Sequence, residues 1–391
     1  MPDGDWKQRY AALRLREIKH RFTYKKINDR MAQALLRYKT CENKKNMRQI
    51  AREIDLCRRF WRCYPLHYFR YNHYREQSRL SDIELRDYIP DFFFYTLFLP
   101  HYDGDEYAPL LEDKVVADSL FRSLDIPTPR SLGAIVRGRL YDGCFSPETA
   151  EAVTEEAAAS GAGKIFVKPA YGSGGHGIIV FTRDEEGCYR DKNGGELGGF
   201  LSRDVLRGDY ILQAGLVQHR SLSAVYPNSV NTFRIATENI GGSVRAVCSV
   251  IRFGCGGREV DNVCQGGIVL KVDGSTGKTA DFGITETGEK YSAHPDTGFR
   301  FSRFSNGGWE AVLRFALDCA AKLPWFTYLG WDIALTGAGP VAIEANLGFG
   351  LDLFQVAHGG LREAFRIGDP DYYWKYAGKR AELPCRRKEI L

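Results

Sequence analysis

The stretch KIFVKPAYGSGGHGIIVF, residues Lys164–Phe181, decides the fold prediction for this chain. A β-type run leads into Lys168-Pro169, a loop follows with glycine at positions 172, 174, 175 and 177, and a second β-type run closes the stretch. Glycine allows a backbone to approach a ligand closely, and successive free N–H groups in such a loop form a concavity that suits phosphate. We therefore expect a nucleoside triphosphate beneath a glycine-rich loop, with the Lys168 charge at its entrance.

Two familiar phosphate loops do not fit this stretch. Gly172, Gly174 and Gly177 match GxGxxG, but a Rossmann site needs a helix after the loop, and Ile178–Phe181 is β-branched and aromatic. The P-loop pattern GxxxxGK[ST] is absent because no Gly-Lys-Ser or Gly-Lys-Thr follows. A strand–loop–strand flap over phosphates remains, and the alternative is an ordinary glycine-rich hairpin.

Bulk properties limit the class of protein. The chain of 391 residues is long enough for two or three domains. It has no run of about 18 apolar residues, so no transmembrane helix is expected, and its start, MPDGDWKQRY, lacks the apolar core of a signal peptide. The 10 cysteines include no CxxC pair, which favours reduced thiols in the cytoplasm over a zinc site or a disulfide framework.

Charge is distributed unevenly along the chain. Residues 1–80 contain 21 Lys or Arg and 8 Asp or Glu, whereas the net charge of the whole chain is only +5, so the remainder is acidic. Aromatic residues such as Trp61, Tyr68 and Tyr74 lie among the basic ones. This pattern is typical of aromatic packing on a core, of contact with an anionic membrane or glycan, or of nucleic-acid binding. We expect packing first and an anionic surface second, at the inner membrane face, and no nucleic acid.

A second constellation lies in GWDIALTGAGPVAIEANLGFG, residues 330–350. Glu344 and Asn346 are two residues apart on one expected strand and so face the same way, and Asp332 lies on the partner strand of the hairpin. Two carboxylates and an amide oxygen are ligands that Mg²⁺ or Mn²⁺ accepts. The alternative is that these groups only form hydrogen bonds beside a loop.

Basic residues on strands form a third set. Arg234 alternates with Phe233 and Ile235 in SVNTFRIATE and therefore leaves the core face. Arg252 ends another apolar strand, and Lys271 in QGGIVLKVD is a weaker member of the set. These cations either neutralise a phosphate or carboxylate or serve as salt-bridge residues.

Together, Lys168-Pro169 with its glycine loop and the distant Asp332 and Glu344-Ala345-Asn346 resemble the ATP-grasp superfamily. The run QAGLVQH…NSVNTFRIAT…GWDIA…IEAN is similar to the sugar-transfer-associated ATP-grasp family. The resemblance covers about residues 110–360. It implies an α+β fold in which two subdomains grip ATP between antiparallel sheets, here with a basic helical extension at the N-terminus.

The resemblance also implies roles for particular residues. Lys114 and Lys168 match the phosphate lysines, Arg234 the arginine that steadies the transferred phosphoryl group, and Arg252 is a further catalytic candidate. The flexible loop that closes on the phosphates corresponds to Gly172, Ser173, Gly174 and Gly175. The nucleotide-binding linker corresponds to Gln213, Ala214 and Leu216, with His219 near the ribose. The metal ligands correspond to Asp332, Glu344 and Asn346. Asn262, Gly266, Gly267 and Lys271 are candidates for substrate contact.

The reaction implied by the resemblance is ligation of a carboxylate to an amine. ATP with Mg²⁺ or Mn²⁺ converts the carboxylate to an acylphosphate, and the amine then displaces phosphate. The substrates are expected to be small molecules or glycan-linked groups, in polysaccharide or glycolipid synthesis. The alternatives are a sugar or alcohol kinase on the same fold and a silent nucleotide-binding module. Asp332→Ala and Glu344→Ala are each expected to abolish activity and leave the fold intact.

The predicted organisation has four parts. Residues 1–85 form the basic helical region, 86–209 the first ATP-grasp subdomain with its connecting segment, 210–365 the second subdomain with the metal site, and 366–391 a tail. Helices are expected over 112–124, 147–160 and 309–323, and strands over 165–167, 178–181, 210–213, 231–237, 244–252, 267–272, 331–335 and 341–345. The sequence leaves the oligomeric state and the identity of both substrates open.

Overall fold

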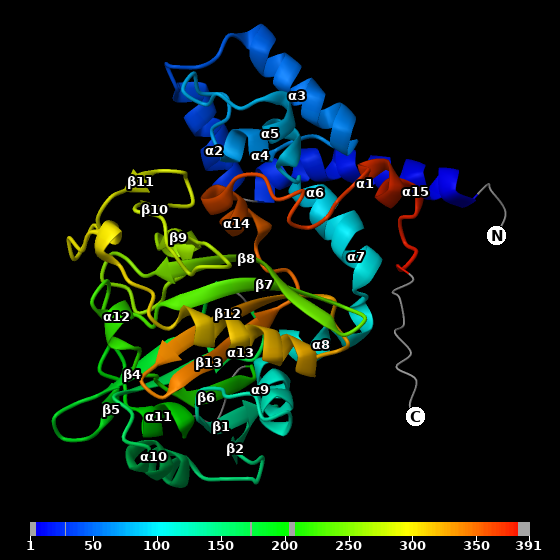
Figure 1. Cartoon of the computed structure of the whole chain (residues 1–391). Helices are drawn as coiled ribbons and strands as arrows, with labels where there is room; N and C mark the ends of the chain where they lie inside the picture. Colours follow the sequence, from blue (N-terminus) through cyan, green and yellow to red (C-terminus); the bar gives the residue numbers. More distant parts are fainter. Residues whose placement is uncertain (1–4, 28, 173, 203–207, 382–391) are drawn as a thin grey trace.

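The computed structural model describes residues 5–27, 29–172, 174–202 and 208–381. In the view of Figure 1 the N-terminal helices lie at the top, a seven-stranded sheet in the middle and a six-stranded sheet at the bottom. Every pair of neighbouring strands is antiparallel. The predicted α+β class with two antiparallel sheets is therefore confirmed. No helix among the described residues is long and apolar enough to cross a membrane.

The N-terminal region is helical, as predicted. Its helices are α1 (Asp5–Ile27), α2 (Asp29–Thr40), α3 (Met47–Trp61), α4 (His67–Arg70) and α5 (Asp82–Asp87). Asn46 caps the N-terminus of helix α3, and its side chain accepts a hydrogen bond from the Gln49 N–H. It buries Ile50, Cys57 and Trp61 on one side, which is the spacing of an amphipathic helix.

Aromatic residues of this basic region are core residues. Trp61, Tyr68, Phe69 and Tyr74 are buried, so the packing interpretation is correct for them. The Trp374 indole N–H donates to the Trp61 carbonyl at 2.8 Å, which ties the end of the described chain to α3.

The segment from residue 366 was expected to be a polar tail, and as far as residue 381 it is part of the folded body. It contains α15 (Pro370–Lys375). Tyr373 and Trp374 of this helix are buried, and α15 lies beside α1 in Figure 1. The aromatic residues of the segment provide the apolar surface that a polar tail would lack.

The six-stranded sheet contains the glycine-loop hairpin. Its strands, in the order β2-β1-β6-β3-β4-β5, are β1 (Ser131–Val136), β2 (Arg139–Asp142), β3 (Lys164–Pro169), β4 (Ile179–Arg183), β5 (Tyr189–Arg190) and β6 (Tyr210–Ala214). Helices α10 (Ala150–Ala159) and α11 (Leu197–Leu201) share an apolar cluster with it. Helix α9 (Lys114–Ser123) contacts it through Val115, which packs with Ala134 and Ile211.

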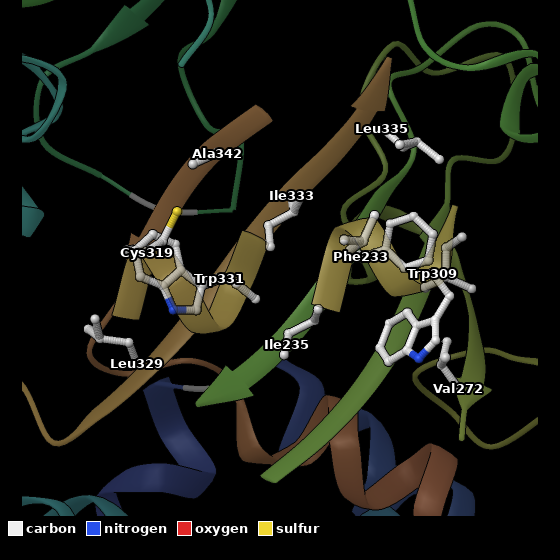
Figure 2. Close-up of a cluster of buried hydrophobic side chains, with 14 of the residues drawn as sticks. Phe233, Ile235, Val272, Trp309, Cys319, Leu329, Trp331, Ile333, Leu335 and Ala342 are labelled. Atoms are coloured by element: carbon white, nitrogen blue, oxygen red, sulfur yellow. The ribbon is translucent and has the colours of Figure 1, made fainter. Parts of the chain in front are cut away.

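The seven-stranded sheet carries the predicted acidic hairpin. Its strands, in the order β11-β10-β9-β8-β7-β12-β13, are β7 (Thr232–Ile240), β8 (Ser243–Phe253), β9 (Ile268–Val272), β10 (Gly283–Ile284), β11 (Lys290–Tyr291), β12 (Tyr328–Thr336) and β13 (Gly339–Asn346). Helix α13 (Trp309–Lys322) covers one face, where Phe233, Ile235 and Trp331 pack against it (Figure 2).

The opposite face of this sheet is covered by helices from both ends of the sequence. They are the continuous run α6 (Asp91–Phe93), η1 (Phe94–Phe98) and α7 (Leu99–Tyr102), together with α14 (Leu351–His358). Ala236, Val250 and Val269 of the sheet belong to the same apolar cluster as these helices. The remaining short helices are η2 (Asp105–Tyr107), α8 (Pro109–Glu112), α12 (Arg220–Ser223), η3 (Val263–Gln265) and η4 (Phe301–Arg303).

Gly330 allows β12 to approach the turn that follows β13. A Cβ on Gly330 would lie 2.0 Å from the Phe349 Cβ, far inside van der Waals contact. We predict that Gly330→Ala destabilises the protein by about 1–3 kcal/mol, because the buried Phe349 must move. The measurement is the apparent melting temperature. Gly199→Ala in α11 is the control, since a Cβ there meets nothing within 4 Å; an equal loss in both variants would contradict the prediction.

Candidate active site

A cleft of about 400 Å³ lies between the two sheets, lined by strands of both. It brings together most of the residues singled out from the sequence: Lys114, Lys168, Gly172, Gly174, Gly175, Gln213, Ala214, Leu216, Arg234, Arg252, Asn262, Asp332, Glu344 and Asn346. Ser173 lies outside the described residues. The cleft thus joins the glycine loop of one sheet to the acidic hairpin of the other, which are more than 150 residues apart in sequence.

The glycine loop of the six-stranded sheet contacts Asn262 and Gln265, which lie on the far side of the cleft from this sheet. The Gln265 side-chain amide donates to the Gly174 carbonyl at 2.7 Å, and a Cβ on Gly175 would come within 2.7 Å of the Asn262 Nδ2 atom. Gly175 also has a φ of 74°, which favours glycine. Glycine at 175 is therefore needed both for the backbone conformation and for the close approach of the loop to Asn262.

Two lysines reach the cleft from the six-stranded sheet and α9. The Lys168 ammonium donates to Gln213 Oε1 at 2.8 Å, and the Gln213 amide donates to Asp118 Oδ1 at 3.2 Å. The Lys114 ammonium donates to the Gly172 carbonyl at 2.6 Å. The Gln213 side chain therefore orients Lys168, and this network includes Asp118, which the sequence analysis missed. Its position four residues after Lys114, on the same side of the helix, was the available signal.

Burial lowers the pKa of Lys168 from 10.5 to about 8, with a further contribution from the Lys114 charge, while Glu344 opposes the shift. The ammonium form still predominates near neutral pH. Lys168 is therefore a cation that loses its charge within an accessible pH range.

Both strand arginines are salt-bridged to the same aspartate. Arg234 forms a two-pronged ion pair with Asp332, and Arg252 lies 3.1 Å from Asp332 and 3.2 Å from Asp261. Asp261 in turn accepts hydrogen bonds from the Thr232 N–H and hydroxyl. The salt-bridge alternative is therefore correct for both arginines, which also line the cleft. Asp261 was not singled out from the sequence, despite lying beside Asn262.

The buried ion pairs set the charge of the two aspartates. Burial alone would raise the pKa of Asp332, but Arg234 and Arg252 together outweigh it, so the pKa lies below its ordinary value. Burial raises the pKa of Asp261, and Arg252 only partly offsets this. Asp332 is therefore a firmly ionised carboxylate.

The acidic hairpin presents the predicted oxygen donors next to Lys114. Asp332 is paired with Glu344 across β12 and β13, and Asn346 with Gly330. The Lys114 ammonium lies 3.7 Å from Glu344, and the Asn346 Nδ2 atom is buried without a hydrogen-bond partner. Among the described residues no group of three or more His, Cys, Asp or Glu could hold a metal, but here the third donor is an amide. The donor types fit Mg²⁺ or Mn²⁺.

Four predicted residues do not line the cleft. His219 caps α12 by accepting from the Ser221 N–H, and Lys271 is exposed on β9. Gly266 and Gly267 shape the turn after η3, where a Cβ on Gly267 would lie 2.7 Å from the Asp261 carbonyl oxygen. His219, Gly266 and Gly267 thus have local structural roles, and the predicted ligand contacts of all four residues stay predictions.

Comparison with known families agrees with the geometry of the cleft. Residues 94–366 match the family described as sugar-transfer associated ATP-grasp. The chain belongs to this family. The predicted ATP-grasp fold is thereby confirmed, with the glycine-loop hairpin in one sheet and the acidic hairpin in the other. The family match begins after α5, so the helices before it lie outside the matched region.

Comparison with solved structures found matches at low sequence identity. They include D-alanyl-alanine synthetase A from Vibrio cholerae (11% identity, TM-score 0.41, 70% of this chain and 68% of that chain), VanG D-Ala:D-Ser ligase from Enterococcus faecalis (13%, 0.38, 67% and 61%) and biotin carboxylase from Campylobacter jejuni (12%, 0.40, 72% and 49%). The matched part thus spans from about half to about two thirds of those chains. No curated protein sequence matches the chain.

We predict that the Lys168 side chain titrates near pH 8. As pH rises through this value the cleft loses one positive charge, so its affinity for a polyanion falls. The measurement is lysine side-chain NMR, with the Lys168 signal assigned from its loss in Lys168→Met. A midpoint near the ordinary value of 10.5 would show that the amine is hydrated and not buried as described.

The structure changes the expected effect of removing Asp332. Because Asp332 is buried between two arginines, Asp332→Ala removes the carboxylate paired with Arg234 and leaves Arg252 with Asp261. We predict a loss of roughly 3–5 kcal/mol in stability. Glu344 is partly exposed, with 28% of its side chain accessible, so Glu344→Ala is expected to change stability by less than about 1 kcal/mol. Denaturant unfolding of both variants tests this contrast, and equal stabilities would refute it.

Proposed function

We propose that the protein is an ATP-dependent carboxylate–amine ligase that forms an amide through an acylphosphate intermediate. The observation that carries this proposal is the distance of 3.7 Å between the Lys114 ammonium and the Glu344 carboxylate. This contact brings a cation of α9, which packs on the six-stranded sheet, next to the oxygen donors of the seven-stranded sheet. Membership of the sugar-transfer associated ATP-grasp family supports the same reading.

In this proposal ATP lies beneath the glycine loop, with its phosphates toward the acidic hairpin. Lys114 and Lys168 neutralise phosphate oxygens, and each would exchange a protein partner, the Gly172 carbonyl and Gln213 respectively, for the ligand. The segment from Gln213 to Leu216, which begins in β6 and continues past its end, lines the cleft and would offer backbone groups to the base. Closing the loop excludes water, which protects an acylphosphate from hydrolysis.

Glu344 and Asn346 would hold the metal together with Asp332. A bound Mg²⁺ would neutralise phosphate charge and orient the phosphates for in-line transfer. Since both Asp332 oxygens contact guanidinium groups, Glu344 and Asn346 are the donors with the fewest competing partners among the three.

The proposed reaction has two steps. A carboxylate oxygen attacks the γ-phosphorus, the bond to the bridging oxygen of ADP breaks, and ADP leaves with the electron pair. The amine nitrogen then attacks the acyl carbon, the C–N bond forms, the bond to the phosphate oxygen breaks, and the amine proton passes to solvent or a nearby base. Arg234 and Arg252 would stabilise the negative charge of the transferred phosphoryl group and of the departing phosphate.

The family description suggests a glycan-linked or lipid-linked acceptor, and the surface charge of the N-terminal region supports an anionic one. Residues 1–80 contain 21 Lys or Arg against 8 Asp or Glu. The exposed Arg52 and Arg59 of α3 are already paired with Asp82 and Asp55, and the aromatic residues Trp61 and Tyr68 are buried. The region therefore offers charge but little aromatic surface to an acceptor. Attraction of this kind weakens as salt rises.

The test is ADP release from Mg-ATP by the full chain with a panel of carboxylates, each with and without amines. Release that requires both a carboxylate and an amine supports the ligase. ADP with a stable phosphorylated alcohol or sugar would instead identify a kinase, and tight Mg-ATP binding without turnover across the panel would indicate a silent module. The expected product is an amide detectable by mass spectrometry.

We predict that Lys168→Met and Glu344→Gln each reduce the rate of ADP release by about 10²-fold or more, because the first removes a cation that would face the phosphates and the second removes a carboxylate that would hold the metal. The matched controls are Lys278→Met and Glu310→Gln, whose side chains are exposed and lie outside the cleft. Wild-type rates in the first pair, or losses of equal size in the controls, would contradict the assignment.

A further inference from the structure

Helix α1 of the N-terminal region is attached to the body of the protein through one of its faces. Tyr10 and Leu13 pack on the apolar cluster that contains Trp374, and the ring centroids of Tyr10 and Trp374 lie 5.7 Å apart. The Glu17 side chain is buried and accepts a hydrogen bond from the Tyr64 N–H at 2.9 Å. Positions 10, 13 and 17 share one side of a helix because they are three and four residues apart. Apolar and polar contacts together therefore fix which face of α1 is docked.

A second face of α1 turns apolar side chains to solvent. Leu15 is 69% exposed and Ile18 is 41% exposed, and Ala11 is exposed as well. Positions 11, 15 and 18 also share a side of the helix, since they are four and three residues apart. A surface helix usually keeps its polar residues outward and its apolar residues inward. In α1 a glutamate is buried while a leucine and an isoleucine are exposed, so packing within this chain does not account for the second face.

The helix that carries this apolar face is strongly basic. The 23 residues of α1 include 8 Lys or Arg and only 2 Asp or Glu, and one of these two acids is the buried Glu17. Arg16, which follows Leu15 directly, is exposed. In residues 1–80 the 21 Lys or Arg outnumber the 8 Asp or Glu, so the acids of this region are too few to neutralise it. The apolar face thus belongs to a segment with a large excess of positive charge.

Exposed apolar residues beside basic ones fit an anionic membrane surface. A helix at such a surface lies in the plane of the bilayer, with its apolar side chains at the boundary of the acyl chains and its basic side chains near the headgroups. Anionic lipids attract basic segments of this kind. A soluble anionic glycan would respond to the same charge, but it has no acyl chains that could cover Leu15 and Ile18.

Exposure of a single apolar residue is not enough for this argument, because soluble proteins commonly have such residues. Ile83 of α5 illustrates the difference. It is 66% exposed, but it lies between Asp82 and Glu84, which place acidic groups beside it. An anionic membrane would repel this position, which makes Ile83 a useful control for Ile18.

We propose that the second face of α1 binds an anionic membrane surface, with Leu15 and Ile18 inserted among the lipid headgroups. The sequence left an anionic membrane and an anionic glycan as alternatives, and the exposed leucine and isoleucine favour the membrane. The inference does not rest on the proposed ligase function. Helix α1 precedes the family match at residues 94–366, and none of its described residues lines the cleft.

The test is co-sedimentation of the full chain with lipid vesicles. One set of vesicles contains phosphatidylcholine alone, and the other contains equal parts of phosphatidylcholine and phosphatidylglycerol. We expect about tenfold or more tighter binding to the anionic vesicles. The double variant Leu15→Gln with Ile18→Gln should lose about tenfold or more of this affinity, because glutamine removes the apolar groups and still favours a helix.

Further variants separate membrane insertion from folding and from general charge. Leu15→Phe with Ile18→Phe keeps the face apolar and should bind the anionic vesicles at least as tightly as wild type. Ile83→Gln is the matched control and should also bind as wild type. Arg16→Gln should weaken binding about two- to fivefold, whereas Arg139→Gln, at an exposed position of β2, should not. The apparent melting temperature of each variant checks that it is folded.

Equal affinity for the two kinds of vesicle would overturn the inference, as would wild-type binding by the double glutamine variant. Heparin, a soluble anionic polysaccharide, provides a second arm of the test. If heparin displaces the protein from vesicles and the double glutamine variant behaves as wild type in both assays, the region is a binding site for soluble polyanions and the membrane assignment is wrong. The assay needs no nucleotide, so its outcome is independent of whether the ligase proposal holds.

Discussion

The buried ion pairs of Asp332 with Arg234 and Arg252 are the interaction on which the rest of the cleft depends. The three residues lie on neighbouring strands, β12, β7 and β8. Three buried charges are tolerated only because each has partners in good geometry. The network extends in two directions: Arg234 donates to the Phe349 carbonyl at 3.0 Å, which fixes the turn before α14, and Arg252 fixes Asp261, at the start of the turn that meets the glycine loop.

The N-terminal region and the ATP-grasp part share one apolar core. Trp61 belongs to the same buried cluster as Val250 of β8 and Phe354 of α14. Polar contacts also join the two parts. The Gln355 side chain accepts a hydrogen bond from the Ile89 N–H and donates one to the Ile89 carbonyl. Burial of large aromatic side chains at such a boundary makes independent motion of the two parts costly.

Local patterns in the sequence were sufficient to predict much of this fold. The alternation around Arg234 correctly placed Phe233 and Ile235 in the core, because side chains alternate across a strand. The two-residue spacing of Glu344 and Asn346, and the glycines of the loop, likewise led to residues that line one cleft. Each of these features is set by the backbone geometry of a single segment.

Partnerships between distant segments could not be predicted in the same way. Nothing near Arg234 indicates that its partner is Asp332, 98 residues away, and nothing near Arg70 indicates that it lines the cleft. The position of His219 beside a binding segment likewise gave no indication that its side chain caps a helix, as it does here. The segment after 366 was judged polar, although Tyr373 and Trp374 find apolar partners in helices far away in sequence.

The contacts of the glycine loop have a consequence for the order of events in the cleft. Lys114 holds the loop through the Gly172 carbonyl, yet the same ammonium would be needed by an arriving phosphate. A hydrogen bond from a charged group contributes about 1.5–3 kcal/mol, so its transfer to a ligand would raise the open population of the loop roughly tenfold to a hundredfold unless the phosphates replaced it. Under the proposed function, the Lys114 ammonium would have to leave the Gly172 carbonyl before it could bind a phosphate. Binding of the ligand would therefore be coupled to movement of the glycine loop.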